Sequence, residues 1–181
     1  ADAHKERALA AASLHEALRN GDLHLLAQPI VPLAAGSAAP VGYEVLLRMR
    51  GRDGDLLEPA KFFDAAERHH LLGALDRWVL GALGERAAPY AAALADRGMR
   101  LRLNVSAHSL ADPEFAALAL EQLERAGLPP SVLCFEVREA LAVSRRRETE
   151  AFVAAVTAAG CTVVLDNCGT GIGPLGEPPA L

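Results

Sequence analysis

Cysteine, aromatic residues and long apolar runs are all scarce in this sequence of 181 residues. The three cysteines form no CxxC pair and leave one unpaired in any disulfide scheme, which favours a reducing cytoplasmic compartment over secretion. No apolar stretch reaches the ~20 residues that a membrane span needs. Residues 1–20 carry charges throughout and lack the apolar centre of a signal peptide, so neither kind of targeting segment is expected.

An excess of positive charge is also missing. The net charge of −5 and the pI near 5.7 argue against binding to a nucleic-acid polymer, which usually needs clustered Lys and Arg. Hydrophobic residues make up 51% of the chain and the mean hydropathy is +0.16, which excludes intrinsic disorder. We expect one domain over residues 21–181, preceded by a linker helix over residues 1–20.

Apolar patterning predicts a chain in which strands and helices alternate. Strands are expected over 23–33, 41–49, 101–106, 132–137 and 162–167, and helices over 60–94 (broken near Pro89), 112–126 and 145–159. Asp112 and Pro113 are predicted to begin the second of these helices. The last three strands lie about 30 residues apart with a helix between them, which indicates βαβ units and an α/β fold with a parallel sheet.

Each of four strands carries a polar residue where a buried strand should be apolar: Glu44, Asn104, Glu136 and Asp166. Alternation places each of the first three opposite its apolar neighbours, and the last three lie near carboxyl ends, where α/β barrels build their sites. One such residue alone is more often a loop anchor or cap. Four of them favour a polar-ligand site, and hard oxygen ligands suit Mg²⁺ or Mn²⁺.

Five motifs in order carry a family resemblance: QPIVPL, GYEVLLRM, NVSAHSLADPEF, CFEVREAL and LDNCGTG. The chain resembles the EAL family, which comprises bacterial cyclic di-GMP phosphodiesterases and their degenerate relatives. The resemblance implies a TIM-like (β/α) barrel whose first strand is antiparallel to the rest. It also implies one or two Mg²⁺ or Mn²⁺ ions that activate a water to open the cyclic dinucleotide to pGpG.

The same resemblance assigns roles to individual residues. It implies metal ligation by Glu44, Asn104, Glu136 and Asp166, contact with the dinucleotide by Gln28 and Arg48, and catalytic-site roles for Glu139 and Asn167. Glu139 matches a glutamate that steadies the loop after the last strand. Asn167 stands where the family has a second aspartate, itself a metal ligand.

Several departures from the family pattern bear on activity. The signature reads Glu44-Val45-Leu46, a mild change because Val45 points away from the site. An amide at Asn167 supplies neither negative charge nor a base, and Arg138 and Cys168 replace a threonine and a phenylalanine. The family's lysine-bearing K-x-D strand lies beyond the sequence, so we expect an incomplete barrel with about five of its eight strands.

Three functions remain open. The first is a degenerate EAL domain that binds cyclic di-GMP or relays a signal without efficient hydrolysis, with metal weakly held or absent. The second is a metal-dependent phosphodiesterase when complete, and the third is a ligand-free dimerisation or docking module. The departures favour the first over the second, and the retained site residues favour it over the third. The resemblance further implies an upstream GGDEF or sensor domain and a homodimer.

Other candidate features have simpler interpretations. His69 and His70 are expected at a helix end rather than at a metal, whereas His108 follows the NVS motif and could approach a ligand. The loop over 169–171 could cradle a phosphate, although a tight turn after a strand explains its glycines as well.

Overall fold

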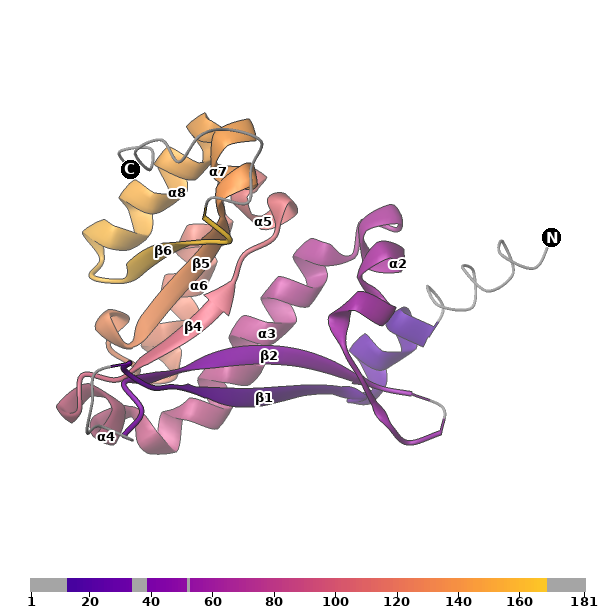
Figure 1. Ribbon diagram of the computed structural model, residues 1–181, viewed down its shortest axis with the longest axis horizontal. Helices are drawn as coiled ribbons and strands as arrows, with labels where there is room; N and C mark the ends of the chain where they lie inside the picture. Colours follow the sequence, from indigo (N-terminus) through magenta and orange to yellow (C-terminus); the bar gives the residue numbers. More distant parts are fainter. Residues whose placement is uncertain (1–12, 34–38, 52, 169–181) are drawn as a thin grey trace.

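The computed structural model describes residues 13–33, 39–51 and 53–168. Within this part, a helix over 13–20 leads into a sheet of six strands whose main order is β1-β2-β4-β5-β6 (Figure 1). The strands are β1 (Leu23–Ile30), β2 (Gly42–Arg50), β3 (Leu56–Leu57), β4 (Arg100–Asn104), β5 (Leu133–Arg138) and β6 (Thr162–Asp166). The pairs β1–β2 and β2–β3 are antiparallel, whereas β2, β4, β5 and β6 run parallel to one another.

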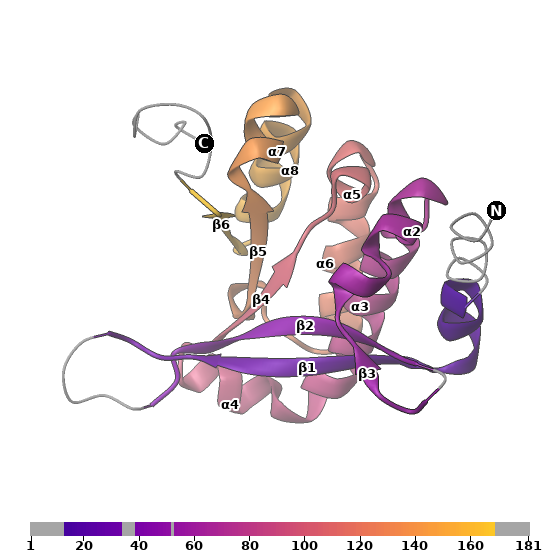
Figure 2. The same ribbon diagram turned by 45° about the vertical axis from the view of Figure 1, so that its right-hand side comes forward.

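The main helices pack on one face of this sheet, as Figure 2 shows. They are α2 (Phe63–Arg68), α3 (Leu72–Ala87), α4 (Ala91–Asp96), α5 (Ala107–Ala111), α6 (Phe115–Arg125), α7 (Glu139–Ser144) and α8 (Arg146–Ala158). Three short 3₁₀ helices lie at Pro59–Lys61 before α2, at Ala88–Tyr90 between α3 and α4, and at Pro130–Val132 before β5. No helix in the described ranges is both long and apolar enough to cross a membrane.

Strand alternation sorts the side chains of the sheet between two environments. Leu101 and Leu103 of β4 and Phe135 and Val137 of β5 are buried in a cluster against α3, α6 and α8. A second cluster, which contains Leu14, joins the 13–20 helix to α2, α3 and the far ends of β1 and β2. Both clusters lie on the helix-covered face. The residues at alternate positions of each strand therefore point to the opposite, open face of the sheet.

The predicted strands are confirmed to within three residues at each end. The predicted helical region over 60–94 is broken at His70 as well as near Pro89. His70 has a left-handed φ of 56°, and His70 N and Leu71 N donate to Glu67 O and Ala66 O, a pairing typical of a helix carboxyl end. The expected helix-end role of His69 and His70 is therefore confirmed.

Three short elements escaped prediction: β3, α5 and α7. The start predicted for the helix over 112–126 is wrong, because α6 begins at Phe115. Asp112 instead accepts a hydrogen bond from the backbone N of Glu114 and so closes the turn before the helix. The linker helix is described only from residue 13, and the predicted loop over 169–171 lies outside the described residues.

Candidate functional site

Four polar side chains from three adjacent strands meet on the open face of the sheet. The register places Glu44 of β2 directly opposite Arg102 of β4, and Asn104 of β4 opposite Glu136 of β5. The contacts run along the diagonals of this arrangement. Asn104 Nδ2 donates to Glu44 Oε1 at 3.1 Å, and Arg102 Nη1 donates to Glu136 Oε1 at 3.1 Å. Strand β4 thus holds one carboxylate on each side.

Glu136 is the most deeply placed carboxylate of the group, with 8% of its surface exposed. Burial raises the pKa of Glu136, and the negative charges of Glu44 and Asp166 raise it further. The hydrogen bond and positive charge of Arg102 act in the opposite direction. Glu44 and Asp166 are therefore each close enough to repel the Glu136 carboxylate, and Arg102 is a nearby positive charge that offsets part of this repulsion.

The remaining predicted ligands lie around this group on the same face. Asp166, the last residue of β6, pairs in register with Arg138, two residues beyond Glu136 along β5. Gln28 of β1 pairs directly with Glu44. Arg48 lies four residues along β2 from Glu44, on the same face by alternation, and its Nη1 donates to the backbone O of Leu47 at 2.8 Å.

Glu139 and Asn167 follow the strands that carry Glu136 and Asp166. Glu139 is the first residue of α7, one residue after the end of β5. Asn167 comes directly after β6 with a φ of 56°, a left-handed conformation that asparagine adopts more readily than most residues. Both residues lie at the carboxyl edge of the parallel strands, as the sequence predicts.

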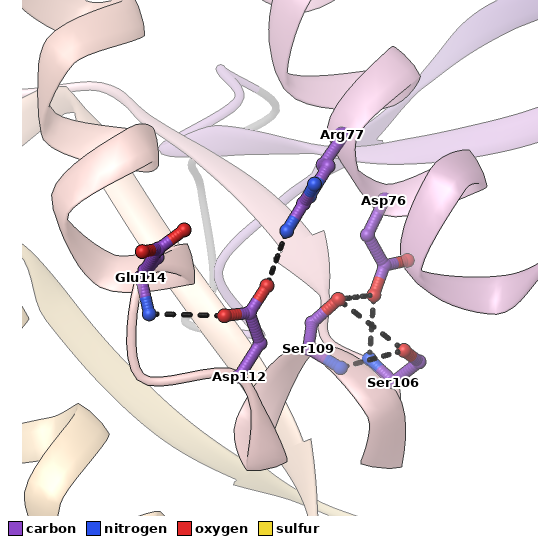
Figure 3. Close-up of polar contacts among 6 residues, drawn as sticks. All are labelled: Asp76, Arg77, Ser106, Ser109, Asp112 and Glu114. Atoms are coloured by element: carbon purple, nitrogen blue, oxygen red, sulfur yellow. Dashed lines mark hydrogen bonds and ion pairs between the residues drawn. The ribbon is translucent and has the colours of Figure 1, made fainter.

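The loop that follows Asn104 is fastened to α3 by a half-buried carboxylate, Asp76 (Figure 3). Asp76 Oδ2 accepts hydrogen bonds from the backbone N of Ser106 at 3.0 Å and from the hydroxyl of Ser109 at 2.6 Å. Ser106 caps α5 by accepting from the backbone N of Ser109. Figure 3 also shows Arg77, the next residue of α3, pairing with Asp112 at the far end of α5. Two consecutive residues of α3 therefore position the segment after β4.

Replacing Asp76 should separate the contribution of its oxygen from that of its charge. Asp76→Ala leaves the buried Ser106 N without its acceptor, so we expect the free energy of unfolding to fall by about 1–3 kcal/mol. Asp76→Asn keeps one oxygen that can accept both bonds and should cost clearly less. Urea denaturation of the two variants measures the difference, and equal losses would contradict this role of the oxygen.

The charge of Asp76 should be visible in the pH dependence of stability. Burial, the largest influence, raises the pKa of Asp76 above its ordinary value, although the bonds from Ser109 and Ser106 lower it in part. From about pH 4 upward, the native state then holds more protons than the unfolded state, so this residue's contribution falls as pH rises. The unfolding free energy of the wild type minus that of Asp76→Asn should therefore decrease with pH over this range. A flat or rising difference would contradict the assignment.

The donor set has the chemistry of a divalent-cation site but not its arrangement. Carboxylate and amide oxygens are the ligands that Mg²⁺ prefers. Glu136 Oε1, however, receives the guanidinium of Arg102, and Glu44 Oε1 receives the amide of Asn104. Among the residues that the structure describes, no three or more His, Cys, Asp or Glu side chains are grouped to hold a metal ion. The residues as placed do not fit such an ion, and metal ligation by Glu44, Asn104, Glu136 and Asp166 stays a prediction.

Two hollows lie beside the sheet and not at the carboxylate group. One of about 460 Å³ lies between the β1–β2 pair and helices α3 and α4, on the helix-covered face, and contains none of the predicted site residues. Another of about 390 Å³ borders Asn104 and Arg138 together with α3. Within the group, Glu136 is buried, Glu44 and Asp166 are half-buried and Asn104 is exposed, so the group is reached from solvent on the open face of the sheet.

Comparison with known proteins resolves the family. The sequence model of the EAL domain matches residues 11–177. The chain belongs to the EAL domain family. The α/β fold of EAL type with an antiparallel first strand is thereby confirmed, and the described sheet of six strands is part of such a barrel.

Solved EAL domains superpose closely on this one. The FimX EAL domain of Pseudomonas aeruginosa, solved bound to c-di-GMP, is 29% identical, with a TM-score of 0.77 over 90% of this chain and 64% of that one. The phosphodiesterase PaMucR, solved as a c-di-GMP complex, is 26% identical, with a TM-score of 0.82 over 92% of this chain and 66% of that one.

Sequence relatives of this EAL domain are much longer proteins. Uncharacterized protein Rv1354c of Mycobacterium tuberculosis is 31% identical over 158 residues, which are 87% of this chain and 25% of the relative. Cyclic di-GMP phosphodiesterase PdeF of Escherichia coli is 28% identical over 158 residues, 87% of this chain and 20% of the relative. The chain thus spans about a quarter or less of these two proteins.

Sequence reasoning missed two residues of this EAL domain's site. Arg102 lies two residues before Asn104 in the pattern RLRLN, so alternation already places both on one face, and this signal could have been used. Asp76 lies on a helix 30 residues before Ser106, and no sequence pattern links the two.

Proposed function

We propose that this EAL domain takes part in cyclic di-GMP signalling by binding the dinucleotide on the open face of its sheet without hydrolysing it efficiently. The observation that carries the proposal is the polar group on that face, in a chain that superposes with a TM-score of 0.77 on an EAL domain solved with c-di-GMP bound. In this proposal, Gln28 and Arg48 contact the ligand, and Glu44, Asn104, Glu136 and Asp166 line the polar floor beneath it.

The shape and chemistry of this face support binding of a dinucleotide. Glu44 and Arg48 are separated by roughly 13 Å along β2, at about 3.3 Å per residue. A ligand of that length can lie with one end beside the carboxylate group and reach Arg48 with a phosphate. The guanidinium suits a phosphate because its planar fork can donate two hydrogen bonds at once.

Two features support weak or absent hydrolysis. Phosphodiester cleavage of this kind relies on cations that lower the pKa of a water and polarise the phosphate. Here, Glu136 is already paired with Arg102, and Asn167 offers an amide in place of a second aspartate. Loss of one member of a cooperating catalytic set typically lowers the rate by orders of magnitude.

A regulatory setting in the cytoplasm completes the proposal. The matched segments make up only 25% and 20% of two longer relatives, which fits an EAL unit joined to further domains. We propose an upstream GGDEF or sensor domain and a homodimer, so that binding is transmitted along the helix that includes residues 13–20. A metal-dependent phosphodiesterase and a ligand-free docking module are the outcomes that the experiments below distinguish from this function.

Binding should depend on Arg48. In a calorimetric titration with cyclic di-GMP, Arg48→Ala should weaken binding by about 1–3 kcal/mol, the range of a lost charge-assisted hydrogen bond. Substitution of Asn167 by alanine should change the affinity far less. Arg97→Ala is the matched control, because it removes the same charge from the helix-covered side of the sheet.

The same titration contains the outcomes that exclude the proposal. Equal affinity in the wild type and Arg48→Ala would place the ligand elsewhere. No binding by the folded wild type would favour the docking module.

A further inference from the structure

Arg102 occupies the centre of the carboxylate group. It lies directly across from Glu44 in the β2–β4 register and reaches diagonally to Glu136, which it contacts at 3.1 Å. Arg138, in register with Asp166, is a second arginine beside a carboxylate on this face. The group therefore carries its own positive charges, one of them in an ion pair with the deepest carboxylate.

The surroundings make this ion pair more than a surface contact. The Glu136 side chain is 9% exposed and that of Arg102 is 36% exposed, so the carboxylate is buried and the arginine side chain is partly open to solvent. An unpaired charge buried to this degree is strongly unfavourable, and a partner is therefore required. Arg102 meets this requirement for Glu136 in the absence of any bound ion.

We propose that Arg102 is the resident cation of this site and competes with divalent metal ions for Glu136. A metal ion that binds Glu136 Oε1 has to displace the guanidinium, whose long stem lets it swing toward solvent. The ion then gains the attraction of Glu44, Glu136 and Asp166 but loses the free energy of the ion pair. This competition would give a physical reason for the weak hydrolysis proposed above. It rests on the proposed function only because it takes this group as the family's cation site.

Three variants of Arg102 and its partner test this competition without any dinucleotide. Titration with Mn²⁺, followed by calorimetry, should show ~10-fold or greater tightening in Arg102→Gln, the size expected for a lost charged hydrogen bond. Arg102→Lys keeps a positive charge and should retain the weak wild-type affinity. The gain should vanish when Arg102→Gln is combined with Glu136→Gln, because the carboxylate released by the first change is then gone.

The matched control is Arg100→Gln, which removes one positive charge from an exposed position two residues earlier on the same strand. Its affinity for Mn²⁺ should stay within about twofold of the wild type, because an exposed charge at that distance is screened. Circular dichroism establishes that each variant is folded. If the Arg102→Gln variant is not folded, it is replaced by Arg102→Met, which keeps the apolar stem of the side chain.

Equal Mn²⁺ affinity in the wild type and the neutral Arg102 variant would overturn the proposal. A gain in Mn²⁺ affinity that survives removal of the Glu136 carboxylate would also overturn it, as would an equal gain in Arg100→Gln. Either result would show that the effect comes from net charge and not from competition for Glu136. Failure of cyclic di-GMP to bind would remove the proposed function but leave these metal titrations standing.

Discussion

Replacing Phe135 with alanine is expected to lower the free energy of unfolding by about 3–5 kcal/mol, the range for removal of a buried phenylalanine. Phe135 lies in the middle of β5 and is fully buried. Its ring meets that of Phe152 from α8 edge-on, with centroids 5.1 Å apart, and Phe152 in turn stacks on Phe115 of α6 at 6.1 Å. The substitution therefore opens a cavity where the sheet and two helices meet.

The loss should be large against the total stability of a domain, which is typically about 5–15 kcal/mol. Urea denaturation followed by circular dichroism measures it. Val143→Ala is the matched control, since Val143 is 64% exposed on α7 and its truncation should change stability by less than about 0.5 kcal/mol. A change below about 1 kcal/mol for Phe135→Ala would contradict the placement of this ring in the core. Because Phe135 and Glu136 are neighbours on opposite faces, the core holds the site strand in place.

Replacing Gly42 with alanine should be the second most damaging change, for a different reason. Gly42 begins β2 directly opposite Arg100 of β4. A Cβ at this position would lie 2.4 Å from the backbone O of Arg100, which cannot move without disturbing the β2–β4 ladder. We expect a loss of about 3 kcal/mol, the upper part of the usual range for overpacking.

A glycine in α3 provides a control for which the expected change in unfolding free energy has the opposite sign. A Cβ at Gly81 would meet nothing within 4 Å, so Gly81→Ala should raise the unfolding free energy by about 0.5–1 kcal/mol through reduced backbone freedom. Thermal denaturation of both variants compares the two effects. A stabilised or unchanged Gly42→Ala protein would show that the two strands do not approach as closely as described. Gly42 precedes Glu44 by two residues, so the contact between Glu44 and Asn104 depends on this close approach.

The strands and the face on which the site lies could be predicted because alternation is a local property. Asn104 and Glu136 interrupt apolar strands, and the structure brings them into register as neighbours. Asn104 and Asp166 end their strands, two residues and one residue earlier than the sequence predicts. A spacing of two residues along a strand is enough to place two side chains on the same face, whatever fold the rest of the chain adopts.

The contacts within the site could not be predicted in the same way, because they depend on strand register. In the observed register, Arg102 lies opposite Glu44 and donates to Glu136. A shift of two residues between neighbouring strands would change which carboxylate the arginine reaches. Helices α5 and α7 have five and six residues, too few to show a helical period. The fastening of the loop after β4 by Asp76 joins segments 30 residues apart and appears only when α3 packs beside that loop.

This EAL domain is expected to bind cyclic di-GMP and to leave it intact. Equilibrium dialysis of the purified protein against cyclic di-GMP with Mn²⁺, followed by chromatography of the recovered nucleotide, tests both parts in one measurement. We expect nucleotide retained by the protein and recovered as the cyclic form, with Arg48→Ala retaining less. Steady conversion to pGpG that disappears in Glu44→Ala would contradict the proposed function and establish a phosphodiesterase instead.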